Sequence, residues 1–178
     1  KMFGGNKSEK DVKKLMPDVE KAKVFFASYN ALSNDALRAK TVEFKNRITI
    51  FLTPTDEVIL QKKESAETLP VTDIDGRDSI YKEIDALQKD RNEKIEEILL
   101  QLLPEAFAVV KETSRRFKEN ESLSVIATDL DKELATKKSN VVIEGDKAIH
   151  KNSWTAAGTV VSWNMIHYDV QLIGGAVL

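Results

Sequence analysis

Residues 80–102, which read IYKEIDALQKDRNEKIEEILLQL, decide the fold class. One set of positions recurs there at spacings of three or four among Lys, Asp and Glu: Ile80, Ile84, Leu87, Arg91, Ile95, Ile98 and Leu102. This spacing places one stripe on a helix surface and predicts a long helix. Pro104 either kinks that helix or opens a successor, because proline lacks the N–H that an interior helical position donates.

Two further helices are predicted nearer the N-terminus. The first carries helix-spaced apolar residues at Val12, Leu15, Met16, Val19, Ala22 and Phe26. The second begins at Ser33, a good N-cap residue, with Asp35 in a first turn where the helix dipole favours an anion. It is expected to end at Pro54. Residues 53–79 combine prolines and Gly76 with Thr, Asp and Glu, and this composition predicts loop or mobile structure.

The sequence changes character after Glu121. Thr128 and Asp131 have the spacing of a capping box, which predicts a short helix through Leu134. Residues 140–144 and 147–153 flank Gly145-Asp146 and predict a β-hairpin. The fold class is therefore mainly α with a small β-hairpin insertion.

The C-terminal residues complete the pattern. Val161, Met165, Tyr168 and Leu172 are helix-spaced, which predicts a helix within 160–172. The Gly174-Gly175 pair is expected to end that helix, with a strand starting at residues 176–178.

Composition excludes several classes of function. The chain has 178 residues, 42% of them hydrophobic and 31% charged, which is typical of one folded domain. A net charge of −2 argues against a nucleic-acid binder. The absence of Cys excludes disulfides and thiolate zinc sites and fits a reducing compartment, and two His leave little room for a His-ligated metal. No apolar run approaches the roughly 18 residues of a spanning helix.

Short motifs alone add little. Gly4-Gly5-Asn6-Lys7-Ser8 lacks the glycine spacing of a phosphate-binding loop, and neither His150 nor His167 lies in a nucleophile-elbow setting. From residue types alone, the chain is a mostly helical domain without an assigned reaction.

Four blocks of sequence, in chain order, carry a resemblance to a known family. They are KMFG at 1–4, LSNDALRAKT with EF at 32–44, LPEAFAVVKE at 103–112 and MIHYDVQLIGG at 165–175. Together they resemble the N-terminus of the SecA family of bacterial preprotein translocase ATPases. The resemblance implies that residues 1–178 form the N-terminal helical part of a first, RecA-like (helicase-type) nucleotide-binding domain. Segments at about 53–97 and 117–163 are longer than the family's short members and are interpreted as insertions.

The last block resembles the family's adenine-reading Q motif, which assigns Gln171 as the cofactor-binding residue. A Gln amide offers a donor and an acceptor in one plane, which matches the N6 donor and N7 acceptor of adenine. Met165 and Tyr168, one helical turn apart in the predicted helix, are the expected apolar and aromatic wall for the base. The alternative is that both are core residues and that Gln171 is an exposed helix-end amide.

The cofactor implied for the parent protein is ATP with Mg. The family's Walker A loop follows shortly after the Gly-Gly block, and the 178 residues do not reach it. Since that loop holds the phosphates and Mg, we expect no catalytic residue in these 178 residues, no hydrolysis by them alone and no tight nucleotide binding.

The N-terminal helix is basic, with five Lys against Glu9 and Asp11 over residues 1–14. The resemblance implies contacts of this region with anionic phospholipid, the SecYEG-type channel and a second copy in a homodimer. The residues expected to contact the membrane or channel are Lys7, Lys10, Lys13 and Lys14. The alternative is an ordinary solvated helix face.

The implied parent protein pushes unfolded preproteins through the Sec channel, is cytoplasmic and associates with the inner membrane from that side. No nucleic-acid partner is expected. The competing hypothesis is a helical protein-interaction scaffold without nucleotide chemistry.

Overall fold

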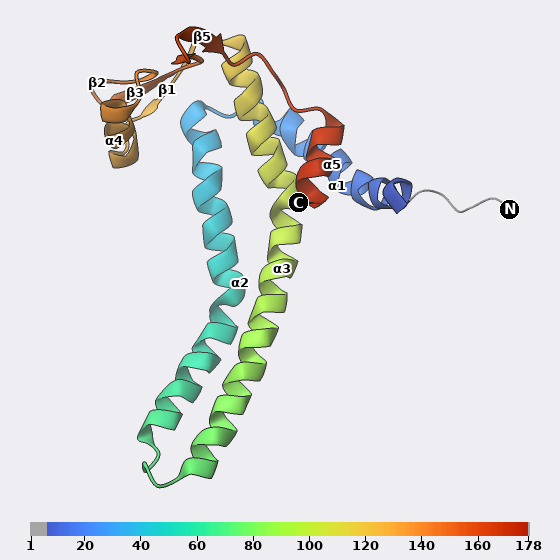
Figure 1. Cartoon of the computed structure of the whole chain (residues 1–178), viewed down its shortest axis with the longest axis vertical. Coiled ribbons are helices and arrows are strands. Elements are labelled where there is room, and N and C mark those ends of the chain that lie inside the picture. Colours follow the sequence, from blue (N-terminus) through green and yellow to red (C-terminus); the bar gives the residue numbers. More distant parts are fainter. Residues whose placement is uncertain (1–6, 178) are drawn as a thin grey trace, which may run out of the picture. The chain divides into compact units, whose positions relative to one another are not determined.

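The computed structural model describes residues 7–177 of the chain, with side chains described from Val12 onward. The chain divides into two compact units, one formed by Lys1–Lys40 with Leu103–Leu178 and the other by Thr41–Leu102. We call the first the head unit and the second the helical-pair unit. The described residues are mostly helical, with two small antiparallel sheets (Figure 1). The predicted mainly α fold class is confirmed at this level.

Three long helices dominate the chain: α1 over Lys7–Tyr29, α2 over Asn34–Thr68 and α3 over Ile74–Glu119. The N-cap prediction at Ser33 is confirmed, because its Oγ accepts a hydrogen bond from the Ala36 N–H at 3.1 Å. The helix predicted over 80–102 is confirmed and is longer at both ends. Pro104 lies inside α3, so the alternative of a successor helix starting there is wrong.

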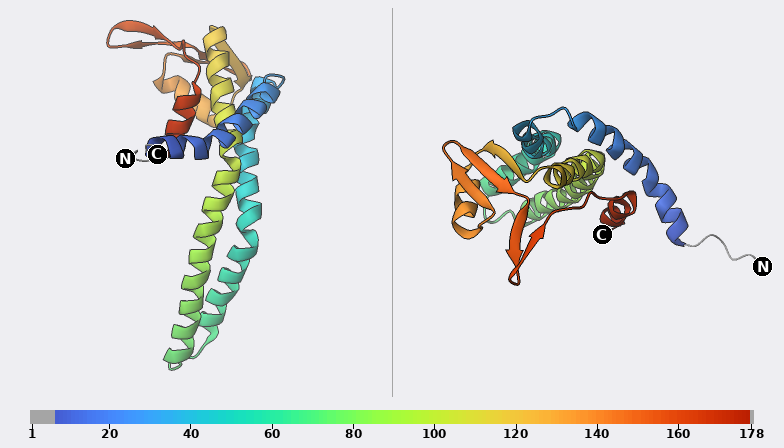
Figure 2. Two further views of the ribbon diagram at one scale, coloured as in Figure 1. Left: turned by 90° about the vertical axis from the view of Figure 1, so that its right-hand side faces the viewer. Right: turned by 90° about the horizontal axis from the view of Figure 1, so that it is seen from above.

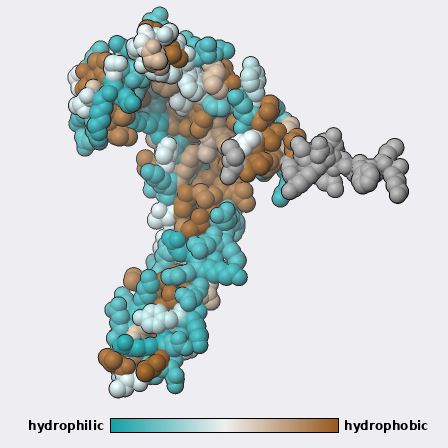
Figure 3. Space-filling model, in the orientation of Figure 1, coloured by the Kyte–Doolittle hydropathy of each residue, from teal (hydrophilic) through white to brown (hydrophobic). Residues whose placement is uncertain are grey.

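The helical-pair unit consists of the distal part of α2 and the first part of α3, which run side by side in Figures 1 and 2. Its buried apolar side chains come from both helices: Leu52, Ile59 and Ala66 of α2, and Ile84, Ile98 and Leu102 of α3. Polar contacts reinforce the pair. Arg91 Nε donates to Asp56 Oδ1 at 2.5 Å, Lys94 Nζ donates to Thr55 Oγ1 at 2.7 Å, and Lys62 pairs with Glu83. Figure 3 shows a largely hydrophilic surface over this unit.

The loop predicted over residues 53–79 is wrong, because only residues 69–73 lie outside the helices. Pro54 is tolerated inside α2, where burial of Leu52 and Ile59 against α3 outweighs the missing N–H. Gly76 lies in the first turn of α3, where its N–H donates to Asp73 Oδ1 at 3.0 Å. A Cβ at this glycine would lie 2.5 Å from Asp73 Oδ2, so Gly76 permits the cap rather than marking a loop.

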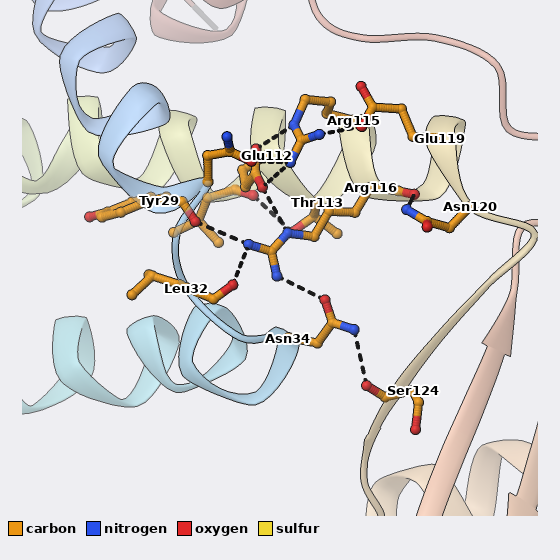
Figure 4. Close-up of polar contacts among 12 residues, drawn as sticks. Tyr29, Leu32, Asn34, Glu112, Thr113, Arg115, Arg116, Glu119, Asn120 and Ser124 are labelled. Carbon is orange, nitrogen blue, oxygen red and sulfur yellow. Dashed lines mark hydrogen bonds and ion pairs between the residues drawn. The ribbon is translucent and has the colours of Figure 1, made fainter.

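The head unit is held together by a buried arginine. Arg116 donates to the Tyr29 and Leu32 carbonyls at 3.0 and 2.7 Å, to Asn34 Oδ1 at 2.8 Å and to Glu112 Oε1 at 2.7 Å (Figure 4). Glu112 is fully buried. Burial opposes its ionisation, but hydrogen bonds from Arg115 and Arg116 outweigh that cost and lower the pKa of Glu112. This network attaches the turn that joins α1 and α2 to helix α3.

The strands follow α3. The larger sheet has the order β1-β3-β2, with β1 over Ser122–Ile126, β2 over Val141–Glu144 and β3 over Lys147–Lys151. All pairs are antiparallel, with Val125 opposite Ala148 and Val142 opposite Ile149. The predicted hairpin is thus confirmed as β2–β3, with Gly145 at φ 61° in its turn. Strand β1 was not predicted.

Helix α4 spans Asp129–Lys137 and begins with the predicted capping box. The Asp131 N–H donates to Thr128 Oγ1 at 3.4 Å, and the Thr128 N–H donates back to Asp131 Oδ2 at 2.8 Å. Arg38 of α2 also donates to both oxygens of Asp131, at 2.8 and 3.0 Å, and His150 Nε2 lies 3.1 Å from Oδ1. Asp131 therefore ties α2, α4 and β3 together.

A second sheet consists of β4 over Ser153–Ala156 and β5 over Thr159–Ser162. Helix α5 then spans Asp169–Val177. The helix predicted within 160–172 is wrong for residues 160–168. Residues 160–162 belong to β5, whose β-branched residues pair with β4, and residues 163–168 lie in neither a helix nor a strand. The break predicted at Gly174-Gly175 is also wrong. Both glycines are helical, as are residues 176 and 177, which were expected to start a strand.

Candidate functional site

The candidate site is the start of α5 with the segment that leads into it, residues 163–172. Of the three residues predicted here, Met165 and Tyr168 precede the helix. They are therefore not one helical turn apart on a common face, as the sequence predicted. Met165 is half-buried, and its carbonyl accepts a hydrogen bond from Trp163 Nε1 at 2.9 Å. Tyr168 is 74% exposed, which rules out the alternative that it belongs to the core.

Gln171 lies in the first turn of α5 and is exposed. Its Oε1 accepts a hydrogen bond from the Tyr168 N–H at 2.8 Å, which is the reciprocal half of a capping box. A carbonyl oxygen has a second lone pair, and Gln171 Nε2 donates to no other described residue. The amide thus keeps an acceptor and two donors available to a ligand while it caps its own helix.

Asp169 fixes where α5 begins. Its Oδ2 lies 2.7 Å from Lys23 Nζ of α1, and its Oδ1 lies 3.6 Å from Lys111 Nζ of α3. The hydrogen bond from Lys23 is the main cause of the lowered pKa of Asp169, and the same bond raises the pKa of Lys23. Lys111 Nζ also lies 5.4 Å from the centre of the Phe26 ring. Two cations from two helices therefore hold the acidic start of α5, where the helix dipole also favours a carboxylate.

Apolar contacts hold the rest of α5. Leu172 is buried, and a Cβ at Gly175 would lie 3.5 Å from the Phe107 ring. This packing fixes which face of α5 is buried, and Gln171 lies on the exposed face.

A hollow of about 400 Å³ lies beside this segment. Its lining is mainly apolar and comes from α3 and the residues before α5: Val109, Val110, Thr113, Ser114, Phe117, Trp163 and His167. His167 Nδ1 lies 3.2 Å from Ser114 Oγ. Sequence reasoning missed Trp163 and His167 because it placed them in a helix. The absence of charged residues from Asn152 to Tyr168 was the sequence feature that could have set this segment apart from the charged helices of the chain.

The predicted membrane-contact lysines are described only in part. Lys13 and Lys14 are exposed on α1, whereas the side chains of Lys7 and Lys10 lie outside the described residues. Within residues 7–177, no helix is long and apolar enough to cross a membrane. Within the same residues, no group of three or more His, Asp and Glu side chains is placed to hold a metal ion.

Comparison with known proteins places the chain in a family. The chain matches the SecA DEAD-like domain over residues 1–178. It is 48% identical over 178 residues to a protein translocase subunit SecA of Flavobacterium psychrophilum. It is 46% identical to the corresponding subunits of Parabacteroides distasonis over 178 residues and of Christiangramia forsetii over 179. Each alignment covers 100% of this chain and 16% of the relative. No solved structure matches the chain.

The chain therefore belongs to the SecA DEAD-like domain family, as the four sequence blocks indicated. It spans about a sixth of the length of these relatives.

Proposed function

We propose that this chain is the N-terminal part of the first, RecA-like nucleotide-binding domain of a SecA-type preprotein translocase ATPase. Family membership over all 178 residues supports this function over a scaffold without nucleotide chemistry. The observation that carries it is Gln171, an exposed amide held at the start of an anchored helix.

The residues near Gln171 suit an adenine base but not the whole nucleotide. An aromatic side chain, Tyr168, lies exposed three positions before the amide. The apolar hollow is lined by Trp163 and His167 of the same segment and not by Gln171, Met165 or Tyr168. Met165 remains part of the proposed base wall, although it is half-buried. The 178 residues contain no GxxxxGK[ST] sequence, so the phosphates and Mg of ATP require residues elsewhere in the parent protein. Bound ATP supplies the free energy for moving the preprotein.

A test must separate base reading from helix capping, because Gln171 does both in this proposal. In the parent protein, Gln171→Ala removes both functions. Gln171→Glu keeps an acceptor for the Tyr168 N–H but removes the amide donors. We expect both variants to lose about tenfold in the preference for ATP over GTP, since a two-point base contact contributes about 1–3 kcal/mol.

The matched control is Gln88→Ala, at an exposed glutamine in the helical-pair unit. Nucleotide affinity is measured by titration with fluorescent ATP and GTP analogues. If Gln171→Glu keeps the wild-type preference for ATP, Gln171 acts as a cap and not as a base reader.

The 178-residue chain alone is proposed to lack hydrolysis, since it contains no phosphate-binding loop. ATP hydrolysis by the purified chain that persists after Gln171→Ala would contradict this proposal.

The proposed partners of the parent protein are the SecYEG-type channel, unfolded preproteins, anionic phospholipid and a second copy in a homodimer. The proposed location is the cytoplasmic face of the inner membrane. For lipid, the support is the exposure of Lys13 and Lys14 and the local excess of lysine. Replacing Lys7, Lys10, Lys13 and Lys14 by Gln should reduce flotation with anionic vesicles and leave behaviour with neutral vesicles unchanged.

A further inference from the structure

The outer edge of β1 in the larger sheet of the head unit is covered by side chains of α2. On the outer edge of β1, the Ser124 carbonyl accepts from Asn34 Nδ2 at 3.1 Å, and the Ile126 N–H donates to Asp35 Oδ1 at 2.8 Å. On the other side, α4 packs against β2, and the Val141 N–H donates to the Lys138 carbonyl at 3.2 Å. The β1 edge is thus closed by side chains of α2, and on the β2 edge the Val141 N–H is bonded within the chain.

The β4–β5 hairpin has no such cover among the described residues. Its two strands pair only with each other, and Figure 2 shows them projecting from the rest of the head unit. The Trp163 N–H donates to the Asn152 carbonyl at 2.8 Å, so hydrogen-bonded pairs alternate from there along the hairpin. Thr155 and Val160 form a non-hydrogen-bonded pair in this alternation. Their main-chain N–H and C=O groups therefore point outward, where no described residue takes them.

Apart from the shortness of its four-residue strands, the hairpin lacks the features that normally protect an open edge. Folded proteins block edge strands with charged side chains, especially Lys, or with Pro. From Asn152 to Tyr168 the chain contains no charged residue and no Pro. All four residues of β5 are exposed, with Val160 at 70%. An isolated pair of strands is only marginally stable, so a third strand would add to it directly.

We propose that the outer edge of β5 binds an extended, uncharged segment of an unfolded polypeptide as a third strand. Main-chain pairing does not depend on the partner's side chains, and an uncharged edge favours a segment without charge. Pairing along four residues buries far less than the roughly 1,000 Å² of a stable interface, so this edge suits the transient binding of a segment and not a lasting dimer of this chain. The apolar hollow at Trp163 and Phe117 lies just beyond β5 and is available to an apolar side chain of the segment.

This inference rests on the proposed function only for the source of the segment, a preprotein. It does not use the nucleotide site, so the two proposals fail separately. Loss of ATP preference is measured at Gln171, whereas strand addition is measured at Val160 in the 178-residue chain.

The probe is a blocked, fluorescent peptide that alternates Val and Ser, titrated into the chain while anisotropy is followed. Val160→Pro removes an outward N–H without removing a hairpin hydrogen bond, because Val160 is in a non-hydrogen-bonded pair. We expect binding about tenfold weaker, since the main-chain pairing at that residue is lost. Val160→Lys, a charged edge residue, should weaken binding similarly and serves if the proline variant does not fold.

The matched control is Val24→Lys, which places the same charge at a valine of equal exposure, 70%, on α1. It should bind the peptide like the wild type. A peptide N-methylated on alternate residues should not bind. Wild-type affinity for both Val160 variants, or binding of the N-methylated peptide, would overturn the proposal. So would a chain dimer, detected by sedimentation, that Val160→Lys dissociates, because the occupant would then be a second copy.

Discussion

The two sheets of the head unit are neighbours in sequence but are stabilised differently. The three-stranded sheet is joined to the helices through polar contacts, chiefly the Arg38–Asp131 pair and the hydrogen bond from the Ile126 N–H to Asp35. The β4–β5 hairpin contains no charged residue, and its strands pair only with each other. The comparison shows that charged side chains anchor the larger sheet and that one of them, Asp35, helps to close its β1 edge, whereas the second sheet has neither feature.

Of the changes that test this difference between the sheets, removal of Asp131 should cause the largest loss of stability. Asp131→Ala leaves the guanidinium of Arg38 without its two carboxylate bonds and removes the capping box of α4. Because Asp131 is 1% exposed and accepts hydrogen bonds from Arg38 and Thr128, we expect the free energy of unfolding to fall by about 2–3 kcal/mol in urea titrations, from the lost charged hydrogen bonds and the lost cap. The control is Asp129→Ala, whose fully exposed carboxylate lies in the same helical turn. An equal loss in both variants would mean that the buried pair does not anchor the sheet.

The same carboxylate makes the larger sheet sensitive to acid. Burial opposes ionisation of Asp131, but hydrogen bonds from Arg38 and Thr128 outweigh it and hold the pKa of Asp131 well below its usual value. Stabilisation is therefore complete above the unfolded-state pKa of about 3.9 and is lost as the pH falls towards the folded-state pKa. The stability difference between the wild type and Asp131→Asn should shrink when the pH is lowered from about 7 to about 3.

The hairpin should not share this sensitivity, since no residue from Asn152 to Ile166 titrates. Hydrogen exchange at the Val161 amide, corrected for its intrinsic pH dependence, should report the same opening free energy at both pH values. A parallel acid loss at Val161 and at Ala148 of β3 would show that the two sheets open as one.

Local rules predicted part of this arrangement. The capping box at Thr128 and the Gly145 turn depend on residues close in sequence, so their spacing was sufficient. Strand β1 was missed because its pairing with β3 depends on residues about 25 positions away. The extension of α2 past Pro54 was missed because the packing of Leu52 against α3 is not a local property.

The candidate site shows the same limit. The position of Gln171 came from family resemblance, whereas its capping bond to Tyr168 required knowing where α5 begins. That start depends on Lys23 and Lys111, which lie far from Asp169 in the sequence. Helical spacing from Val161 to Leu172 was misleading because β5 pairs with β4 instead.

Opening one edge of the larger sheet should have a smaller effect than removing Asp131. Asp35→Asn weakens the acceptor for the Ile126 N–H and removes a favourable charge from the first turn of α2. Asp75→Asn is the matched control, because Asp75 lies in the first turn of α3 and has no hydrogen bond or ion pair from its side chain to another described residue. The difference between the variants in unfolding free energy should be about 1 kcal/mol. Exchange at the Ile126 amide should accelerate only in Asp35→Asn, and equal behaviour would mean that this edge is not closed by Asp35.

The smallest change should appear in the turn of the β4–β5 hairpin. Ala157 and Gly158 have φ values of 48° and 81°, a left-handed pair that favours Asn-Gly in two-residue turns. Ala157→Asn should relieve about 0.5–1 kcal/mol of backbone strain and slow exchange at the Val161 amide severalfold. The urea midpoint of the chain should stay unchanged, because a hairpin without anchors opens before the rest of the head unit does. Gly158→Ala should accelerate the same amide. If Ala157→Asn instead raises the urea midpoint and increases the free energy of unfolding of the chain by the full strain energy, the hairpin unfolds together with the larger sheet. Their difference in anchoring then has no energetic consequence.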